Sequence, residues 1–178
     1  MFIESVLKPK ETFAAQKSKA SIGSAVKNYA IACLIMGVIY FVLALTSTLA
    51  SGNIMAGVTG GVILLIGVPV FLGFFAIIGT GFIFVIAKLL GGNGSYTSLL
   101  YLNSLYSPLI YFLSLIPFVG FLASIYSVYL FFLSVKESQE LNSGRAAIVV
   151  AIPIILTVII AVLIAMVFVL RTIPASSR

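Results

Sequence analysis

Two stripes of uncharged polar residues are the groups in this 178-residue chain with the greatest capacity for chemistry. Their members recur at intervals of about three or four residues, which places each stripe on one face of a helix. The first stripe contains Asn103, Ser107, Tyr111 and Ser114, with Ser104 beside them, and the second contains Gly120, Ser124, Ser127 and Ser134. Because only a short turn separates the two segments, we expect the stripes to face each other.

Such stripes can hold packed helices together through hydrogen bonds, or they can line a path for a solute or an ion. A hydrogen bond between helices in a membrane contributes about 0.6 kcal/mol on average. Functional pathways usually contain an ionisable group inside the membrane, and neither segment has one. The pattern therefore favours helix packing.

The composition excludes most catalytic chemistry. The chain has no His, no Trp and a single cysteine, Cys33. These absences exclude a Ser-His-Asp triad, a His-ligated metal, a zinc finger and an intrachain disulfide. The glycine-rich segment 91–95 lacks the Lys-Ser/Thr pair of a phosphate loop. We therefore expect no catalytic residue, no metal, no cofactor and no enzymatic activity.

The amino-acid balance is that of an integral membrane protein. Hydrophobic residues make up 62% of the chain and charged residues 8%, against about 45–50% and about 25% in soluble domains. Three stretches, 28–87, 89–135 and 146–170, contain no charged residue. A membrane crossing needs about 20 apolar residues, and helices are the default because backbone groups in lipid must be paired.

We predict an all-α, polytopic transmembrane helical bundle with five spans. The spans are residues 29–50, 54–88, 96–116, 118–135 and 146–170, between a basic leader, 1–28, and an outer tail, 171–178. The 54–88 run is too long for one perpendicular crossing. We expect a short outer segment at 54–66 followed by a span kinked at Pro69. Whether 54–66 is re-entrant or part of the second span stays open.

Local signals mark the ends of several spans. Ser95 is expected to cap the third span and Ser143 the fifth. Pro117 suits the first position of the fourth helix. Of the ten basic residues, eight fall on one side of a five-span topology, which places the N-terminus inside and the C-terminus outside. A topology of four spans, with the third and fourth merged into a re-entrant element, would not agree with this distribution of basic residues.

The leader has two interpretations. Phe2, Ile3, Val6 and Leu7 can share a helix face, and such a helix, with nearby lysines, could anchor the leader at a lipid surface. The alternative, which we favour, is a topology-setting tail that is frayed at its start. Five dispersed lysines without arginine are a poor footprint for nucleic acid, so no nucleic-acid partner is expected.

Several short motifs follow one another between the second and the fifth span, and their positions, together with the polar face of the third span, are our candidate site residues. They are Gly91, Gly92, Gly94, Ser95, Tyr96, Asn103, Tyr106, Ser107, Pro108, Pro117, Gly120, Lys136, Glu137 and Arg145. The order of these motifs resembles the Yip (Ypt/Rab-interacting protein, YIPF) domain family. The resemblance covers about residues 5 to 170 and implies five spans with a cytoplasmic N-terminus.

Eukaryotic members of that family lie in Golgi and endoplasmic reticulum membranes and associate with Rab GTPases. This sequence has a shorter N-terminal segment and no Asp-Leu-x-Gly-Pro motif before the first span, so it looks like a prokaryotic member, and Rab binding is not carried over. We expect a multi-pass protein of the cell membrane, or of Golgi or endoplasmic reticulum membranes if the source is eukaryotic.

The resemblance implies a non-enzymatic scaffold or adaptor for membrane organisation or trafficking. Its expected partners are the lipid bilayer and either copies of itself or other membrane proteins. Small residues four apart, such as Ala161 and Ala165, would permit close approach of helices. The alternative function is a channel, small-solute transporter or lipid-transporting protein that uses the polar faces of spans three and four.

Overall fold

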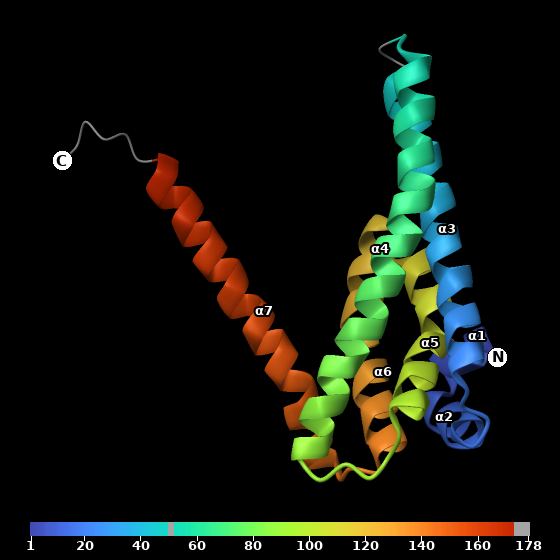
Figure 1. The fold of residues 1–178 in the computed structure, drawn as a ribbon, viewed down its shortest axis with the longest axis vertical. Coiled ribbons are helices and arrows are strands. Elements are labelled where there is room, and N and C mark those ends of the chain that lie inside the picture. The colour runs from blue at the N-terminus through green and yellow to red at the C-terminus, as the bar shows by residue number, and fades with distance from the viewer. Residues whose placement is uncertain (50–51, 173–178) are drawn as a thin grey trace.

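A computed structural model describes residues 1–49 and 52–172, with side chains up to residue 167. Helices joined by short turns make up this part of the chain, which contains no strand (Figure 1). The helices are α1 (Phe2–Leu7), α2 (Pro9–Lys17), α3 (Ile22–Leu49), α4 (Ile54–Leu89), α5 (Tyr96–Leu113), α6 (Pro117–Gln139) and α7 (Ser143–Thr172). The predicted all-α class is confirmed. The tail predicted at 171–178 lies outside the described residues except for its first two positions, which belong to α7.

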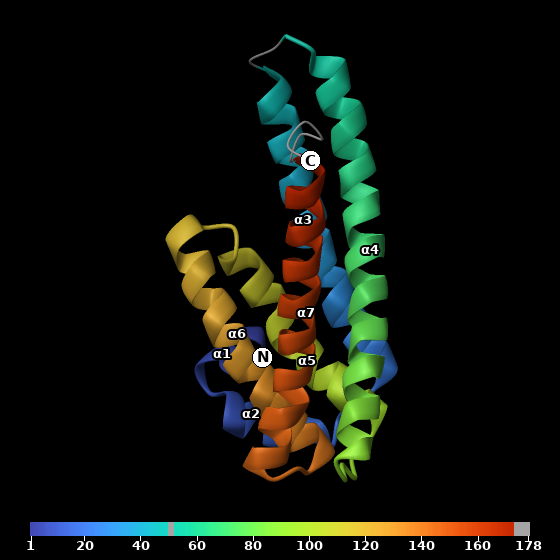
Figure 2. The ribbon, with the colours of Figure 1, turned by 90° about the vertical axis from the view of Figure 1, so that its left-hand side faces the viewer.

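The longest feature is a hairpin of α3 and α4, and it extends beyond the turn between α5 and α6 in both side views (Figures 1 and 2). Residues 54–66 belong to the same helix as the rest of the second span, because α4 runs without a break from Ile54 to Leu89, so the expected separate outer segment is wrong and the alternative that we left open is confirmed. With 36 residues, α4 is about 54 Å long. Pro69 lies inside this helix.

Close packing with α3 accounts for this continuity through Pro69. A Cβ atom at Gly37 of α3 would approach the Leu65 carbonyl oxygen to 2.8 Å and the Pro69 ring to 3.0 Å. Leu65 is the residue whose carbonyl would otherwise accept the missing Pro69 N–H. The absence of a side chain at Gly37 thus lets α3 lie directly against the proline turn and support it.

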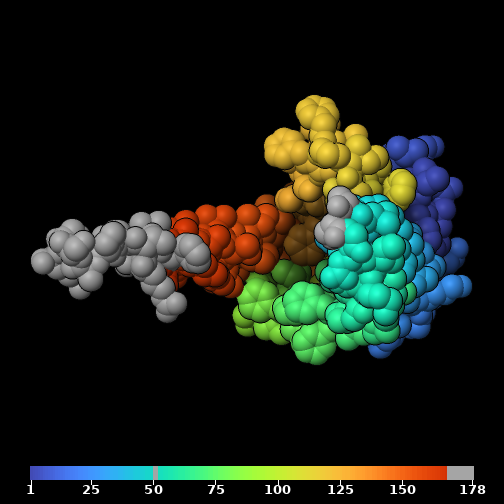
Figure 3. Space-filling model, turned by 90° about the horizontal axis from the view of Figure 1, so that it is seen from above, coloured from blue at the N-terminus to red at the C-terminus, as the bar shows by residue number. Residues whose placement is uncertain are grey.

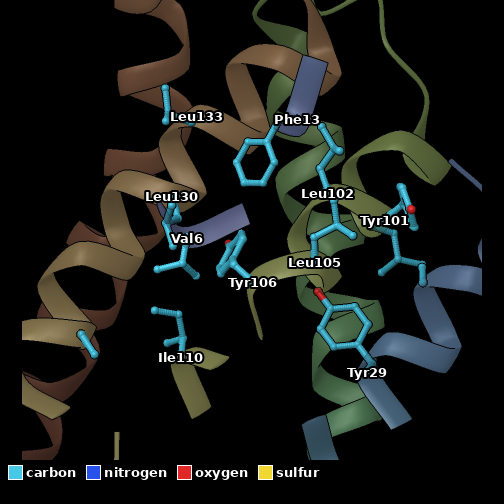
Figure 4. Close-up of a cluster of buried hydrophobic side chains, with 13 residues drawn as sticks. Val6, Phe13, Tyr29, Tyr101, Leu102, Leu105, Tyr106, Ile110, Leu130 and Leu133 are labelled. Atoms are coloured by element: carbon cyan, nitrogen blue, oxygen red, sulfur yellow. The ribbon is translucent and has the colours of Figure 1, made fainter. Parts of the chain in front are cut away.

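The centre of the bundle is α5. Twelve of its 18 residues are buried, which is the highest share among the helices with described side chains. The main hydrophobic cluster surrounds it and includes Leu102 and Leu105 of α5 with Leu130 of α6 (Figure 4). A helix that is enclosed on most sides can carry polar residues, because neighbouring helices rather than lipid meet them.

The leader is docked on the bundle, so the expectation of a frayed tail is wrong. Phe13 of α2 is completely buried and Val6 of α1 is 9% exposed, and both belong to the central cluster (Figure 4). The buried Ser5 hydroxyl donates to the Leu105 carbonyl oxygen at 3.0 Å. Pro9 separates α1 from α2 and occupies the first turn of α2, where its missing N–H costs nothing.

The last helix, α7, separates from the bundle (Figure 1). Its start is held by Ala146, Val149 and Val150, which pack in a second cluster with residues of α4, α5 and α6. Beyond this turn, Pro153 is only half-buried, and every residue from Ile154 to Val167 is exposed. The N-terminal third of α7 therefore anchors a helix whose remainder stands clear.

Four of the described helices are long and apolar enough to cross a membrane, namely α3, α4, α6 and the Ser143–Val167 part of α7. These helices make the chain a multi-pass membrane protein by length and composition. The 18-residue α5, predicted as the third span, is not among the four. It carries Asn103 together with several Ser and Tyr residues, and it is the most enclosed of the long helices with described side chains.

Candidate functional site

The polar residues of α5 form a hydrogen-bonded network with three neighbouring helices. The Asn28 side chain of α3 donates from Nδ2 to the Ser104 hydroxyl at 3.0 Å, and both residues are buried. Ser104 in turn donates to the Tyr101 carbonyl oxygen of its own helix at 2.7 Å. Burying such groups is tolerable because each finds a partner.

Asn103 joins α5 to α6. Its side-chain oxygen accepts hydrogen bonds from the Tyr106 hydroxyl at 3.2 Å and from the Ser134 hydroxyl. The structure therefore brings together one member of each predicted stripe. The other hydroxyls of the second stripe bond to their own helix, since Ser124 donates to the Gly120 carbonyl and Ser127 to the Ser124 carbonyl.

Tyr29 of α3 and Thr80 of α4 extend the network. Both residues are buried, and the Tyr29 hydroxyl lies beside the hydroxyls of Thr80 and Ser107. The sequence analysis missed Asn28, Tyr29 and Thr80 as network members. The available signal was their position near the basic ends of two long apolar runs, at a depth similar to that of Asn103 in α5.

A cavity of about 600 Å³ lies beside this network, between α4, α6 and α7. Asn103, Ser107 and Tyr111 stand on its α5 wall, and Pro153 and Thr157 on its α7 wall. Figure 3, seen along the bundle, shows a hollow between α7 and the other helices. None of the lining residues is charged, so the cavity offers hydrogen bonds and apolar contacts but no charge.

Among the described residues, no three His, Cys, Asp or Glu side chains gather where they could hold a metal. The single thiol, Cys33, is buried on α3. The polar groups that line the cavity are hydroxyl and amide groups, which can donate and accept hydrogen bonds.

The glycine-rich turn between α4 and α5 packs on the end of α6. Gly91 adopts a positive φ of 86°, and the Asn93 N–H donates to the Gln139 carbonyl at 3.0 Å. A Cβ atom at Gly94 would overlap the Ser138 carbonyl oxygen, so the turn approaches α6 in a way that only glycine allows. Gly92 is buried in the same contact.

The residues that follow the turn fix the start of α5. Ser95 is the N-cap, as predicted, and its hydroxyl accepts from the Ser98 N–H at 3.1 Å. The Tyr96 hydroxyl donates to the Ile77 carbonyl of α4 at 3.0 Å. The Gln139 side chain donates to the Ser95 carbonyl at 3.0 Å, which ties the end of α6 to the start of α5.

The remaining candidate positions lie within or at the ends of α5 and α6. Pro108 is buried within α5, and Pro117 is the first residue of α6, as predicted. Gly120 lies against the Ser114 backbone, where a side chain would collide.

At the end of α6, the Lys136 ammonium donates to the Ser143 hydroxyl at 2.9 Å. Glu137 makes no hydrogen bond or ion pair with described residues.

The cap of α7 differs from the prediction. Ser143 is already helical, and the Asn142 side chain accepts from the Arg145 N–H at 2.9 Å. Asn142 therefore performs the capping role that we assigned to Ser143, since asparagine is as good an N-cap as serine. The Arg145 guanidinium reaches back toward Gly91.

The bundle can now be compared with known proteins. The chain matches no curated protein and no solved structure at a significant level. A family model described as the Yip1 domain matches residues 3–166, which include the docked leader, the glycine-rich turn and the central helix. The chain therefore belongs to the Yip1 domain family.

Proposed function

We propose that this protein is a non-catalytic scaffold or adaptor of the cell membrane, which associates through α7 with a second copy or with another membrane protein. The observation that carries this proposal is the separation of α7 from the bundle (Figure 1). Membership of the Yip1 domain family, whose proteins are non-enzymatic membrane proteins, supports it.

The exposed part of α7 has a surface suited to helix association. Lipid tails are as apolar as leucine, so helices in membranes associate through close packing at small residues rather than through hydrophobicity. Ala161 and Ala165 lie one helical turn apart on the exposed part of α7. Another helix can approach the α7 backbone closely along this face.

The non-catalytic part of the proposal rests on the chemistry of the bundle. The described network consists of Asn, Ser, Thr and Tyr side chains, and the cavity beside it has no charged lining residue. The general acids and bases of enzymes are most often His, Asp, Glu or Lys side chains, and none of these lines the cavity.

The membrane topology belongs to the same proposal. We infer five crossings, with α5 as the third, the N-terminus inside and the C-terminus outside. With 18 residues, α5 is about 27 Å long, close to the thickness of a hydrocarbon core. Lys17, Lys88, Lys136 and Arg145 lie at helix ends that meet at one end of the bundle, which the positive-inside rule assigns to the cytoplasm.

Energy transfer between donor- and acceptor-labelled copies in liposomes tests the scaffold role, together with co-purification from mild detergent. We expect association of the wild-type chain with itself or with a reproducible membrane-protein partner. The double variant Ala161→Leu with Ala165→Leu should abolish it by adding bulk to the packing face. The control, Leu163→Phe with Val167→Leu, adds bulk to the opposite face and should preserve it. A strictly monomeric wild-type chain without a reproducible partner would contradict the proposal.

A further inference from the structure

The cavity between α4, α6 and α7 has the size and the wall of a small-molecule site. Its volume of about 600 Å³ falls in the range of about 300–1,000 Å³ typical of ligand pockets. Its lining is mainly apolar, with side chains such as Phe82, Ile83 and Phe131, and a few polar groups stand together on the α5 side. This combination is typical of sites that enclose an apolar body and orient it by one polar group.

One of those polar groups is only half satisfied. Asn103 is 6% exposed, and Tyr106 and Ser134 engage one end of its amide. The other end has no hydrogen-bond partner among the described residues, although Asn103 lines the cavity. The Tyr111 hydroxyl, on the same wall, also has no partner in this part of the chain. The Asn103 amide and the Tyr111 hydroxyl therefore offer hydrogen bonds to an occupant of the cavity. The buried side-chain atom that lacks any partner among the described residues, Gln139 Oε1, lies elsewhere, at the end of α6.

The walls restrict the charge of this ligand. No lining residue carries a charge that could serve as the counter-ion of a phosphate, a carboxylate or an amine. Bringing an unpaired charge into such a site would be costly, whereas an uncharged hydroxyl or carbonyl oxygen can pair with Asn103 and Tyr111. The apolar remainder of the ligand would lie along Phe82, Phe131 and the α7 residues Pro153 and Val158.

We propose that this cavity binds an uncharged lipid-like molecule, with a hydrocarbon chain between α4, α6 and α7 and a hydroxyl or carbonyl oxygen at Asn103 and Tyr111. This inference goes beyond the scaffold role and does not depend on it. The α7 helix of a second copy is a poorer occupant. The exposed part of α7 carries one described polar side chain, Thr157, whose hydroxyl proton is already donated to the Pro153 carbonyl at 2.8 Å.

Photolabelling in liposomes tests the site with a long-chain fatty alcohol that carries a photoreactive diazirine. Parallel arms use the corresponding fatty acid and a diazirine phosphatidylcholine. We expect saturable labelling of residues on α4, α6 and α7 around the cavity by the alcohol, and competition by unlabelled fatty alcohol. Labelling that is unsaturable, or that is equal for the charged probes, would overturn the proposal.

Two glycines of α4 provide a matched pair of variants. Gly79 lines the cavity and Gly73 does not, and a Cβ atom at either position meets nothing within 4 Å. Gly79→Leu should fill the cavity and abolish saturable labelling, while Gly73→Leu should leave it unchanged. If the Gly79→Leu variant is labelled as strongly as the wild-type chain, the proposal is overturned. Cross-links between two copies at the cavity that the fatty alcohol does not displace would also overturn it.

The polar end of the ligand has its own variants. Tyr111→Phe removes one hydrogen bond and should weaken apparent binding about threefold, the effect of an average membrane hydrogen bond. Asn103→Leu should weaken it at least as much, but it also breaks contacts to Tyr106 and Ser134. Ser124→Ala, whose hydroxyl bonds to its own helix, is the control. Unchanged binding by Tyr111→Phe and Asn103→Leu together would contradict the assigned polar contact.

Discussion

The hydroxyl of Tyr126 on α6 donates a 2.7 Å hydrogen bond to the backbone carbonyl of Val6, which lies 120 residues earlier in the chain. This bond ties the first helix to the sixth. Ser5 bonds to the Leu105 carbonyl, and the Tyr101 hydroxyl donates to the Gln16 side chain at 3.1 Å. The leader is therefore an integral part of the bundle and covers one side of α5 and α6.

Loss of the Tyr126 hydroxyl should loosen the leader. Tyr126→Phe removes the donor and leaves the Val6 carbonyl without it, which should destabilise leader docking by about 1 kcal/mol. Faster proteolysis of the leader in detergent would report the change. Tyr129→Phe on the same helix is the control, because its hydroxyl has no partner among the described residues and its side chain is exposed. Equal proteolysis of both variants would contradict the role of the Tyr126 bond.

The glycine-rich turn should tolerate no side chain at its closest contact. Gly94→Ala places a Cβ atom on the Ser138 carbonyl oxygen and should destabilise the fold by about 3 kcal/mol, as overpacking does. Gly144→Ala is the matched control, since its Cβ atom would meet only the Asn142 side chain at 3.7 Å. The thermal midpoint in detergent measures both. Similar midpoints for the two variants would show that the turn does not pack against α6.

The hydrogen bond between Asn28 and Ser104 should appear as a coupling energy. A double-mutant cycle of Asn28→Ala and Ser104→Ala isolates the interaction of α3 with α5. We expect a coupling of about 0.6 kcal/mol, the mean for such bonds in membranes, with an upper bound of about 1.7 kcal/mol. Reversible unfolding in bicelles provides the measurement. Strictly additive effects would mean that the two side chains do not interact.

The ion pair between Lys17 and Glu140 should make leader docking pH-dependent. The two groups are 2.8 Å apart, and the hydrogen bond and charge of Lys17 lower the pKa of the Glu140 carboxyl from its ordinary value of 4.5. Because the folded-state pKa is lowered, the stabilisation is present above pH 4.5 and is lost as the pH falls through the lowered value.

Glu140→Gln should remove this dependence. The wild-type and variant midpoints should differ at neutral pH and converge in acid, and the difference should shrink in high salt because the pair is exposed. Glu137→Gln is the control, since Glu137 has no partner among the described residues. A difference that persists in acid would show that Glu140 acts through packing rather than charge.

The proposed topology can be tested by cysteine labelling in a Cys33→Ala background. Single cysteines at Asn53 and Ile116 should react with a membrane-impermeant maleimide in intact cells, whereas cysteines at Ser18, Asn93 and Asn142 should react only after the membrane is opened. The position of Ile116 is decisive, because it follows α5. Protection at both Asn93 and Ile116 would mean that α5 does not cross.

Several local features could be predicted from the sequence because they depend on neighbouring residues. Ser95 caps α5 and Pro117 starts α6 because capping and proline geometry act within one turn. The prediction of Ser143 as the α7 cap was wrong by one residue, because Asn142 is an equally good cap and the conformation of the loop decides between neighbouring caps.

The membrane class, the helical fold and the polar face of α5 were determined by the sequence alone, because long uncharged runs and residue spacing are properties of the chain itself. The tertiary structure decided that α5 is the central helix, that the leader docks, that α4 continues through Pro69 and that α7 separates. Each of these depends on contacts between residues far apart in the chain, such as Ser5 with Leu105 and Gly37 with Pro69. The free energy of such contacts comes from shape and pairing across helices, which no local pattern encodes.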